Sequence, residues 1–142
     1  MTFAEDIQVL SNRNSSLVFP CMGNEQSAEV KATILDLSDQ VYVYAHDFNG
    51  DVSSLPVYKD SLQAFILKGG HFKLILDKIP ENTTLPSYKC LQDYKSRNWN
   101  ISMILADDSF RDSIESAYQN FLKQTPLRID LSKYKSKWKE SN

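Results

Sequence analysis

The chain has 142 residues, with 18 acidic and 16 basic side chains and a formal net charge of −2 at pH 7. A chain of this length forms one domain that buries a substantial core. The near balance of charge excludes a global electrostatic field that would attract nucleic acid or an anionic membrane, so any such attraction has to be local.

Cysteine usage and the N-terminal sequence predict a cytoplasmic protein. Cys21 and Cys90 do not have C-x-x-C spacing, and two thiols in a chain of this size suit a reducing compartment. Residues 1–14 contain early acidic side chains and lack the apolar core of a secretory signal. No apolar run reaches the roughly 20 residues that cross a bilayer. We therefore expect no membrane partner.

The hydrophobic pattern alternates between helix and strand along the chain. The three central strands begin about thirty residues apart, which is the length of a βαβ unit. All the strands are short, mainly apolar and rich in β-branched or aromatic residues, as is typical of strands covered on both faces in a parallel sheet. In chain order, we predict a helix at about 3–12, a strand at 16–21, a helix at 25–38, a strand at 41–46, a helix at 55–68, a strand at 71–76, a helix at 85–96, a strand at 101–106, a helix at 109–124 and an edge strand at 126–131.

Local signals bound several of these helices. Asn24 suits the N-cap of the second helix, and Asp108 or Ser109 suits the N-cap of the last. The third helix carries Pro56 in its first turn and is expected to stop at Gly69-Gly70.

A phrase occurs twice, as SSLPVYKDSLQAF at 53–65 and TTLPSYKCLQDY at 83–94. In each copy, two hydroxyl residues are expected to cap a helix, Leu-Pro fixes the entry, and a Tyr and a Leu about one turn apart face the sheet. Either a βα unit was duplicated, or two helices with the same role converged on one solution. Two copies are too few for a solenoid.

These patterns predict the α/β class, as a three-layer sandwich. Its mainly parallel sheet would have four to five strands, with helices on both faces joined by right-handed crossovers. We expect a single α/β domain over residues 1–131, followed by a basic C-terminal tail at 132–142. The spacing leaves open which strands are neighbours.

Polar side chains follow each of the three central strands. Because the carboxyl ends of parallel strands meet at one edge of a sheet, ligands gather there. Clustered carboxylates suit Mg²⁺, and Lys78 or His46 could serve a phosphate or a proton transfer. The structural alternative is that Asp and Ser after a strand cap the next helix, and that Asn49-Gly50-Asp51 is a turn. The ligand-binding candidates along this rim are His46, Asp47, Asp51, Asp77, Lys78, Asp107 and Asp108.

The C-terminal stretch interleaves lysines with aromatic residues. Such a pattern could hold a nucleic-acid backbone and stack on bases, and the alternative is a solvated tail. The nucleic-acid-binding candidates are Lys133, Lys135, Lys137, Trp138 and Lys139. No nucleophile elbow or glycine-rich phosphate loop is present, which argues against the common nucleotide-binding modes.

The segment from Ala28 through Ala106 resembles the front half of a phospholipase D-like domain, with a helix, VYVYAHD, a helix ending at Gly-Gly, and HFKLILD in that order. The catalytic signature of that family is His-x-Lys followed by Asp after four more residues. Here His71-Phe72-Lys73 is followed by Asp77 one residue early, so no catalytic role is carried over. The resemblance implies a degenerate, non-hydrolytic half-domain that pairs with a second half. A doubly wound fold of unrelated ancestry is the alternative.

The missing catalytic motifs and the 11% aromatic content favour a non-catalytic binding or assembly module with a protein partner or a homodimer, and no cofactor. Two alternatives stay open. One is a metal-dependent enzyme acting on phosphate esters at the acidic rim, with Mg²⁺ as its metal. The other is a nucleic-acid-binding accessory protein that uses the lysine-rich tail. Whether the chain is an enzyme therefore stays open.

Overall fold

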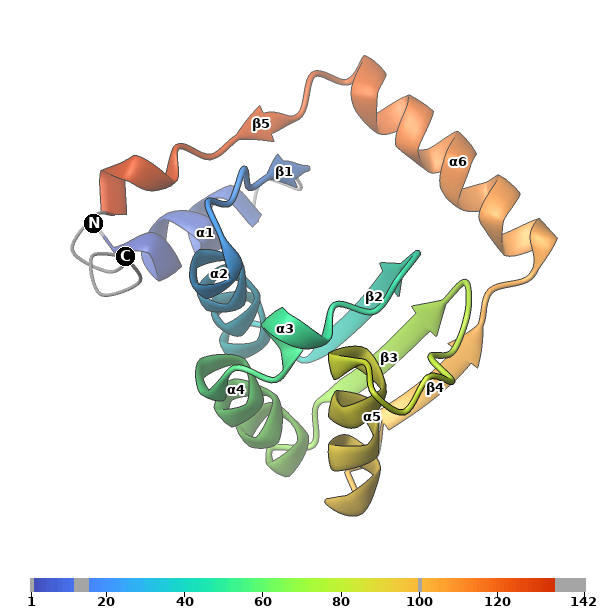
Figure 1. The fold of residues 1–142 in the computed structure, drawn as a ribbon. Helices are drawn as coiled ribbons and strands as arrows, with labels where there is room; N and C mark the ends of the chain where they lie inside the picture. Colours follow the sequence, from blue (N-terminus) through green and yellow to red (C-terminus); the bar gives the residue numbers. More distant parts are fainter. Residues whose placement is uncertain (1, 12–15, 100, 135–142) are drawn as a thin grey trace.

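The structure, a computed structural model, describes residues 2–11, 16–99 and 101–134. A three-stranded parallel sheet lies at its centre, in the order β2-β3-β4. The strands point the same way, so that their carboxyl ends meet at one edge (Figure 1). The predicted α/β class and the parallel sheet are confirmed. The strand bounds are Gln40–Ala45 for β2, His71–Leu76 for β3 and Ile101–Leu105 for β4.

Four helices cover one face of this sheet (Figure 1). Their bounds are Asn24–Asp36 for α2, Gly50–Ser53 for α3, Pro56–Leu67 for α4 and Pro86–Ser96 for α5. Because β2, β3 and β4 are neighbours in chain order, successive right-handed crossovers deliver every connecting helix to the same face. The core between the helices and the sheet contains Phe72, Leu74 and Leu76 of β3, together with Leu62 and Phe65 of α4.

The described residues leave the opposite face of the sheet largely uncovered. On this face, Tyr42 is 59% exposed and Ile104 is 42% exposed. Helix α6 (Asp108–Lys123) approaches it only through its first turns, where the Phe110 ring lies edge-on to Tyr44 with centroids 5.4 Å apart. Beyond this contact α6 runs away from the sheet towards β5 (Figure 1). The helix layer that the sequence predicted on this second face is therefore represented by α6 alone.

A smaller unit packs on the outer side of α2. It consists of α1 (Phe3–Ser11), β1 (Leu17–Val18), β5 (Leu127–Arg128) and the short 3-10 helix η1 (Leu131–Tyr134). Strands β1 and β5 pair in parallel as a separate two-stranded sheet. The four to five strands expected in one sheet are therefore divided between two sheets, and the strand predicted at 16–21 has only two residues. Pro20, which cannot donate to a ladder, limits its extension.

The first residues of the predicted tail belong to this unit. Leu131, the last residue of the predicted domain, is buried in the same apolar cluster as Phe3, and the hydroxyl of Tyr134, in the predicted tail, donates to the Asp6 carboxylate. Residues 135–142 lie outside the described residues.

The helix starts differ from the predicted caps. Leu55 and Leu85 occupy the N-cap positions of α4 and α5 without a side-chain hydrogen bond, so the expected hydroxyl caps in the repeated phrase are wrong. Pro at the first helical position of each helix fixes φ and removes one unsatisfied donor. Asn24 is the first residue of α2 and not its cap, and Asp107 caps α6 in place of Asp108 or Ser109.

The predicted turn at Asn49-Gly50-Asp51 opens the short helix α3. The Asn49 side chain accepts a hydrogen bond from the Val52 amide at 3.2 Å and caps this helix. Gly50 lies against the start of α5, and a Cβ at this position would be 2.4 Å from the Pro86 carbonyl carbon. The repeated Leu-Pro start of α5 is thus docked on a glycine that leaves no space for a side chain.

Replacing Gly50 with alanine should therefore destabilise the fold. Because the clash involves backbone atoms that cannot rotate away, we expect a loss of about 1 to 3 kcal/mol in the free energy of unfolding, measured by urea titration. Asp51→Ala, at an exposed position of the same helix, is the control and should change stability by no more than about 0.5 kcal/mol. Equal stability of Gly50→Ala and wild type would contradict the close approach of α3 and α5.

Candidate functional site

The rim at the carboxyl ends of the strands is organised around Asp77, the residue that follows β3. Its carboxylate accepts a hydrogen bond from the Tyr44 hydroxyl at 2.7 Å and from Arg111 Nε at 3.1 Å. Its second oxygen lies 2.6 Å from His46 Nδ1. Tyr44 belongs to β2, His46 follows β2, and Arg111 lies in the first turns of α6. One carboxylate therefore joins three segments of the chain.

The members of this network differ in their contact with solvent. The Asp77 side chain is only 13% exposed, whereas that of His46 is 78% exposed. The hydrogen bond with His46, followed by those from Tyr44 and Arg111, outweighs burial and lowers the pKa of Asp77 to about 2. The hydrogen bond that Tyr44 donates to Asp77 raises the pKa of the Tyr44 hydroxyl. The hydrogen bond that Arg111 donates to the same carboxylate raises the pKa of Arg111. Asp77 is thus held as a carboxylate.

The geometry of His46 and Asp77 suits hydrogen bonding or proton exchange with a ligand. A carboxylate that binds Nδ1 fixes the orientation of the imidazole ring and leaves Nε2 available on the solvent side. Lys78 lies next to this pair along the chain, and its Nζ is 3.4 Å from the Asp47 carboxylate. The structure therefore brings together two pairs of the predicted rim residues, His46 with Asp77 and Asp47 with Lys78.

The remaining rim carboxylates have separate structural contacts. The Asp107 carboxylate accepts a hydrogen bond from the Phe110 amide at 2.8 Å and caps α6. The Asp108 carboxylate accepts a hydrogen bond from the Arg111 guanidinium at 2.7 Å. Asp51 lies in α3 with its side chain exposed. Within the described ranges, no three His, Cys, Asp or Glu side chains form a group that could hold a metal ion. The shared coordination sphere that the metal hypothesis requires is absent from that part of the chain.

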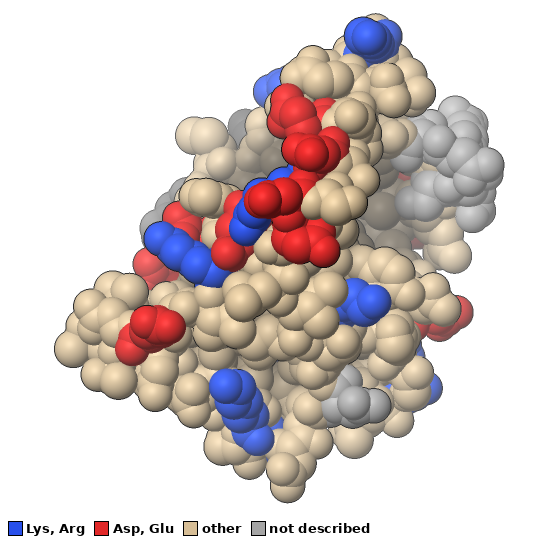
Figure 2. All heavy atoms as spheres, turned by 90° about the vertical axis from the view of Figure 1, so that its right-hand side faces the viewer, with Lys and Arg blue, Asp and Glu red and all other residues tan. Residues whose placement is uncertain are grey.

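The surface around the rim is mixed in charge. Figure 2 shows acidic side chains gathered over the strand ends and α6, with basic side chains between them. Such alternation neutralises each carboxylate locally and leaves no wide positive surface for an anionic polymer.

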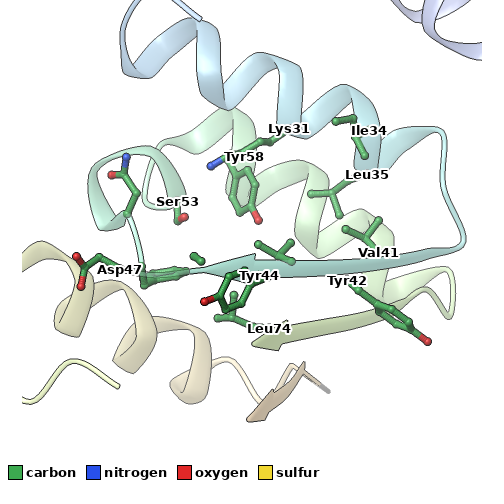
Figure 3. Close-up of a pocket in the computed structure, with 14 residues that line it drawn as sticks. Lys31, Ile34, Leu35, Val41, Tyr42, Tyr44, Asp47, Ser53, Tyr58 and Leu74 are labelled. Carbon is green, nitrogen blue, oxygen red and sulfur yellow. The ribbon is translucent and has the colours of Figure 1, made fainter. Parts of the chain in front are cut away.

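A groove runs along the free edge of β2, between that strand and α2. Its volume is about 390 Å³, within the range of pockets that hold ligands. Ile34 and Leu35 of α2 lie above Val41 of β2, and Lys31 lies nearer to Tyr58 and the Ser53 end (Figure 3). The lining is therefore apolar along its length and polar at one end.

Lys31 provides the positive charge of this groove. Burial lowers the pKa of its ammonium group, partly offset by the nearby Cys21 thiol, and burial raises the pKa of Cys21. Of the ion pairs formed within the described ranges, none includes Lys31. Lys31 is exposed at the surface, and a cation beside apolar side chains complements an anionic group of a ligand in the groove.

The His-x-Lys stretch and the nucleic-acid candidates lie elsewhere. His71 and Lys73 are at the amino end of β3, away from the rim, where the Lys73 ammonium group lies 5.4 Å from the centre of the Tyr42 ring. Of the nucleic-acid candidates, only Lys133 is among the described residues, in η1. The others, Lys135, Lys137, Trp138 and Lys139, lie outside them.

Comparison of the chain with protein-family models, curated proteins and solved structures finds no match in any of the three. Among the described helices, none combines the length and the apolar character that crossing a bilayer requires.

Sequence reasoning missed several residues that build these sites. The sequence pattern indicates only a helix for Arg111 and an aromatic strand position suited to a core or an interface for Tyr44, and it gives no role to Lys31. Arg111 lies four residues after Asp107 on a predicted helix, so its place near the strand ends could have been inferred. Lys31 gives no such signal, since its role depends on which edge of the sheet α2 covers.

Asp77 should make the fold sensitive to acid. Its pKa in the folded chain, about 2, is below the ordinary value of 3.8, so its stabilisation is present above pH 3.8 and is lost as the pH falls towards 2. Asp77→Asn should therefore have a lower melting temperature than wild type at pH 7, with a difference that shrinks below pH 3.8. Thermal unfolding followed by circular dichroism at a series of pH values measures this.

The control for this experiment is Asp51→Asn, at an exposed position of α3. Its difference from wild type should stay small at every pH. A constant difference between Asp77→Asn and wild type over the whole series would contradict the assigned network.

Proposed function

We propose that the chain is a non-catalytic assembly module, in which α6 and the uncovered face of the sheet bind another protein chain. A second copy of the chain is the first partner to test. Under this proposal, the rim network fixes the root of α6 and has no catalytic role.

The observation that carries this proposal is the exposure of the apolar stripe of α6. The helix has 16 residues with an apolar side chain at every turn, yet none of its residues is buried. Tyr118 is 52% exposed and Leu122 is 47% exposed, and the Tyr118 ring stacks on Phe121 with centroids 6.2 Å apart. A helix with one apolar face usually buries that face against a partner.

Two further features support a protein partner. Tyr42 and Ile104 add exposed apolar area on the uncovered face of the sheet, and aromatic side chains are enriched at protein interfaces. The resemblance of residues 28–106 to a half-domain also favours self-association, since that family pairs two halves around one site.

A charge introduced into the stripe should prevent assembly. We expect wild type to form a dimer whose fraction rises with concentration, and Leu122→Glu or Tyr118→Glu to weaken it by about tenfold or more because the carboxylate would be desolvated in the interface. Sedimentation equilibrium measures the dissociation constants.

The matched control is Ser116→Glu, which places the same charge on the opposite face of α6 and should leave the dimer unchanged. Circular dichroism should show that all variants keep the wild-type fold, because the stripe is not buried in the single chain. A wild type that remains monomeric at every concentration would contradict assembly through a second copy.

A further inference from the structure

Strand β2 lies at the edge of the central sheet, and among the described strands β3 is its one partner. The Asp39 carbonyl accepts a hydrogen bond from the His71 amide at 2.9 Å, and the Ala45 carbonyl accepts one from the Asp77 amide at 3.4 Å. A parallel ladder uses alternate residues of each strand, so the odd-numbered residues of β2 bond to β3. The N–H and C=O groups of Tyr42 and Tyr44 therefore point to the free edge.

In the part of the chain that the structure describes, this edge lacks three common protections against a further strand. Natural edge strands are blunted by proline, by lysine or by a bulge. The sequence of β2 is QVYVYA, which contains no proline and no charged residue, and its register with β3 is continuous from Gln40 to Ala45. The strand is therefore suited to accept another extended segment along its full length.

The groove beside this edge lies between a strand and a helix. Helix α2 borders it on one side through Lys31, Ile34 and Leu35 (Figure 3). The α1, β1 and β5 unit packs on the outer side of α2. A bulky sheet with its own helix layer would meet α2 here, whereas one extended chain would contact both the strand edge and the helix.

The charge in the groove selects the chemistry of the segment. Asp47 also lines the groove, but its carboxylate is paired with Lys78. Lys31 is the cation of the lining, and the described part of the chain gives it no acidic partner. A segment that carries an acidic side chain complements this site.

We propose that an extended peptide segment of a partner protein adds to β2 as a further strand in the groove beneath α2. The backbone of Tyr42 and Tyr44 pairs with the segment, the apolar side chains of the groove receive every second residue, and Lys31 pairs with one acidic side chain. The inference rests on the proposed protein-binding role for the class of its ligand, but it uses the backbone edge of β2 in place of α6 and the side chains of the uncovered sheet face.

Two fluorescein-labelled peptides test the proposal. Both alternate valine and threonine, and they differ only in a central glutamate or lysine. Fluorescence anisotropy should show that wild type prefers the glutamate peptide by about three- to tenfold, as expected for a partly exposed ion pair. Lys31→Glu should reverse this preference. Hydrogen exchange should slow at the amides of Tyr42 and Tyr44 when the glutamate peptide is bound.

A proline at position 42 separates strand addition from other contacts. Tyr42→Pro removes the outward amide but leaves the β2–β3 ladder, because Tyr42 does not bond to β3. Tyr42→Ala is its matched control, since it removes the same side chain and keeps the amide. Tyr42→Pro should weaken peptide binding by about tenfold relative to Tyr42→Ala, and both should keep the wild-type circular dichroism spectrum.

Three outcomes would overturn the proposal: no binding of either peptide, equal binding by Tyr42→Pro and Tyr42→Ala, or a loss of the dimer in Tyr42→Pro alone. The last would show that the edge of β2 pairs with a second copy.

The two proposals can fail separately. Leu122→Glu should bind the glutamate peptide as wild type does, and an intact dimer without peptide binding would leave the assembly role of α6 standing.

Discussion

The central position of β3 is the constraint on which the rest of the structure depends. This strand bonds to β2 on one side and β4 on the other, and its residues Phe72, Leu74 and Leu76 form the middle of the core. Because the chain moves from β2 to β3 to β4 in one direction, all the crossover helices lie on one face. The same order leaves the other face largely uncovered, and among the described strands the outer edges of β2 and β4 have no further partner. The surfaces proposed for binding are therefore consequences of strand order.

The rim shows how the chain manages carboxylates that the parallel sheet brings to one edge. Like charges in proximity raise the free energy of the fold unless cations separate them. Arg111 contacts Asp77, Asp108 and the Ala106 carbonyl, and so bridges the end of β3, the end of β4 and α6. These contacts hold the first turns of α6 against the strand ends. The direction in which α6 leaves the sheet is thus set by charged groups, while its apolar stripe stays available.

The elements that could be predicted are those with strong local patterns. The predicted strand at 71–76 matches β3, and Pro56 and Gly69 bound α4 as expected, because proline at a helix start and a glycine with φ of 88° at its end are local requirements. Strand β1 could not be predicted correctly because its two residues acquire their structure only by pairing with β5. Sequence spacing likewise gave no strand order, and hence no information on which sheet face stays open.

The candidate sites divide along the same line. The rim followed from parallel strands alone, so His46 and Asp77 were expected near one another, and they are in contact. Their partner Arg111 is 34 residues from Asp77 and becomes a neighbour only through the position of α6. The groove required the edge position of β2 and the placement of α2 together. A site at the ends of parallel strands can be predicted from a sequence. A site between a strand and a helix cannot be predicted when the sequence does not show that the two elements are neighbours.

The two open surfaces differ in what they demand of a partner. The stripe of α6 presents side chains only, since the helix satisfies its own backbone groups, and it can therefore accept any complementary apolar surface. The edge of β2 presents backbone donors and acceptors, which water satisfies in the single chain at little net cost. A segment in the groove gains binding free energy when it removes water from those groups and from Ile34 and Val41 together. Only an extended backbone can replace every hydrogen bond that water made to the strand edge. The strand edge is for that reason the more selective surface, and Lys31 adds the choice of charge.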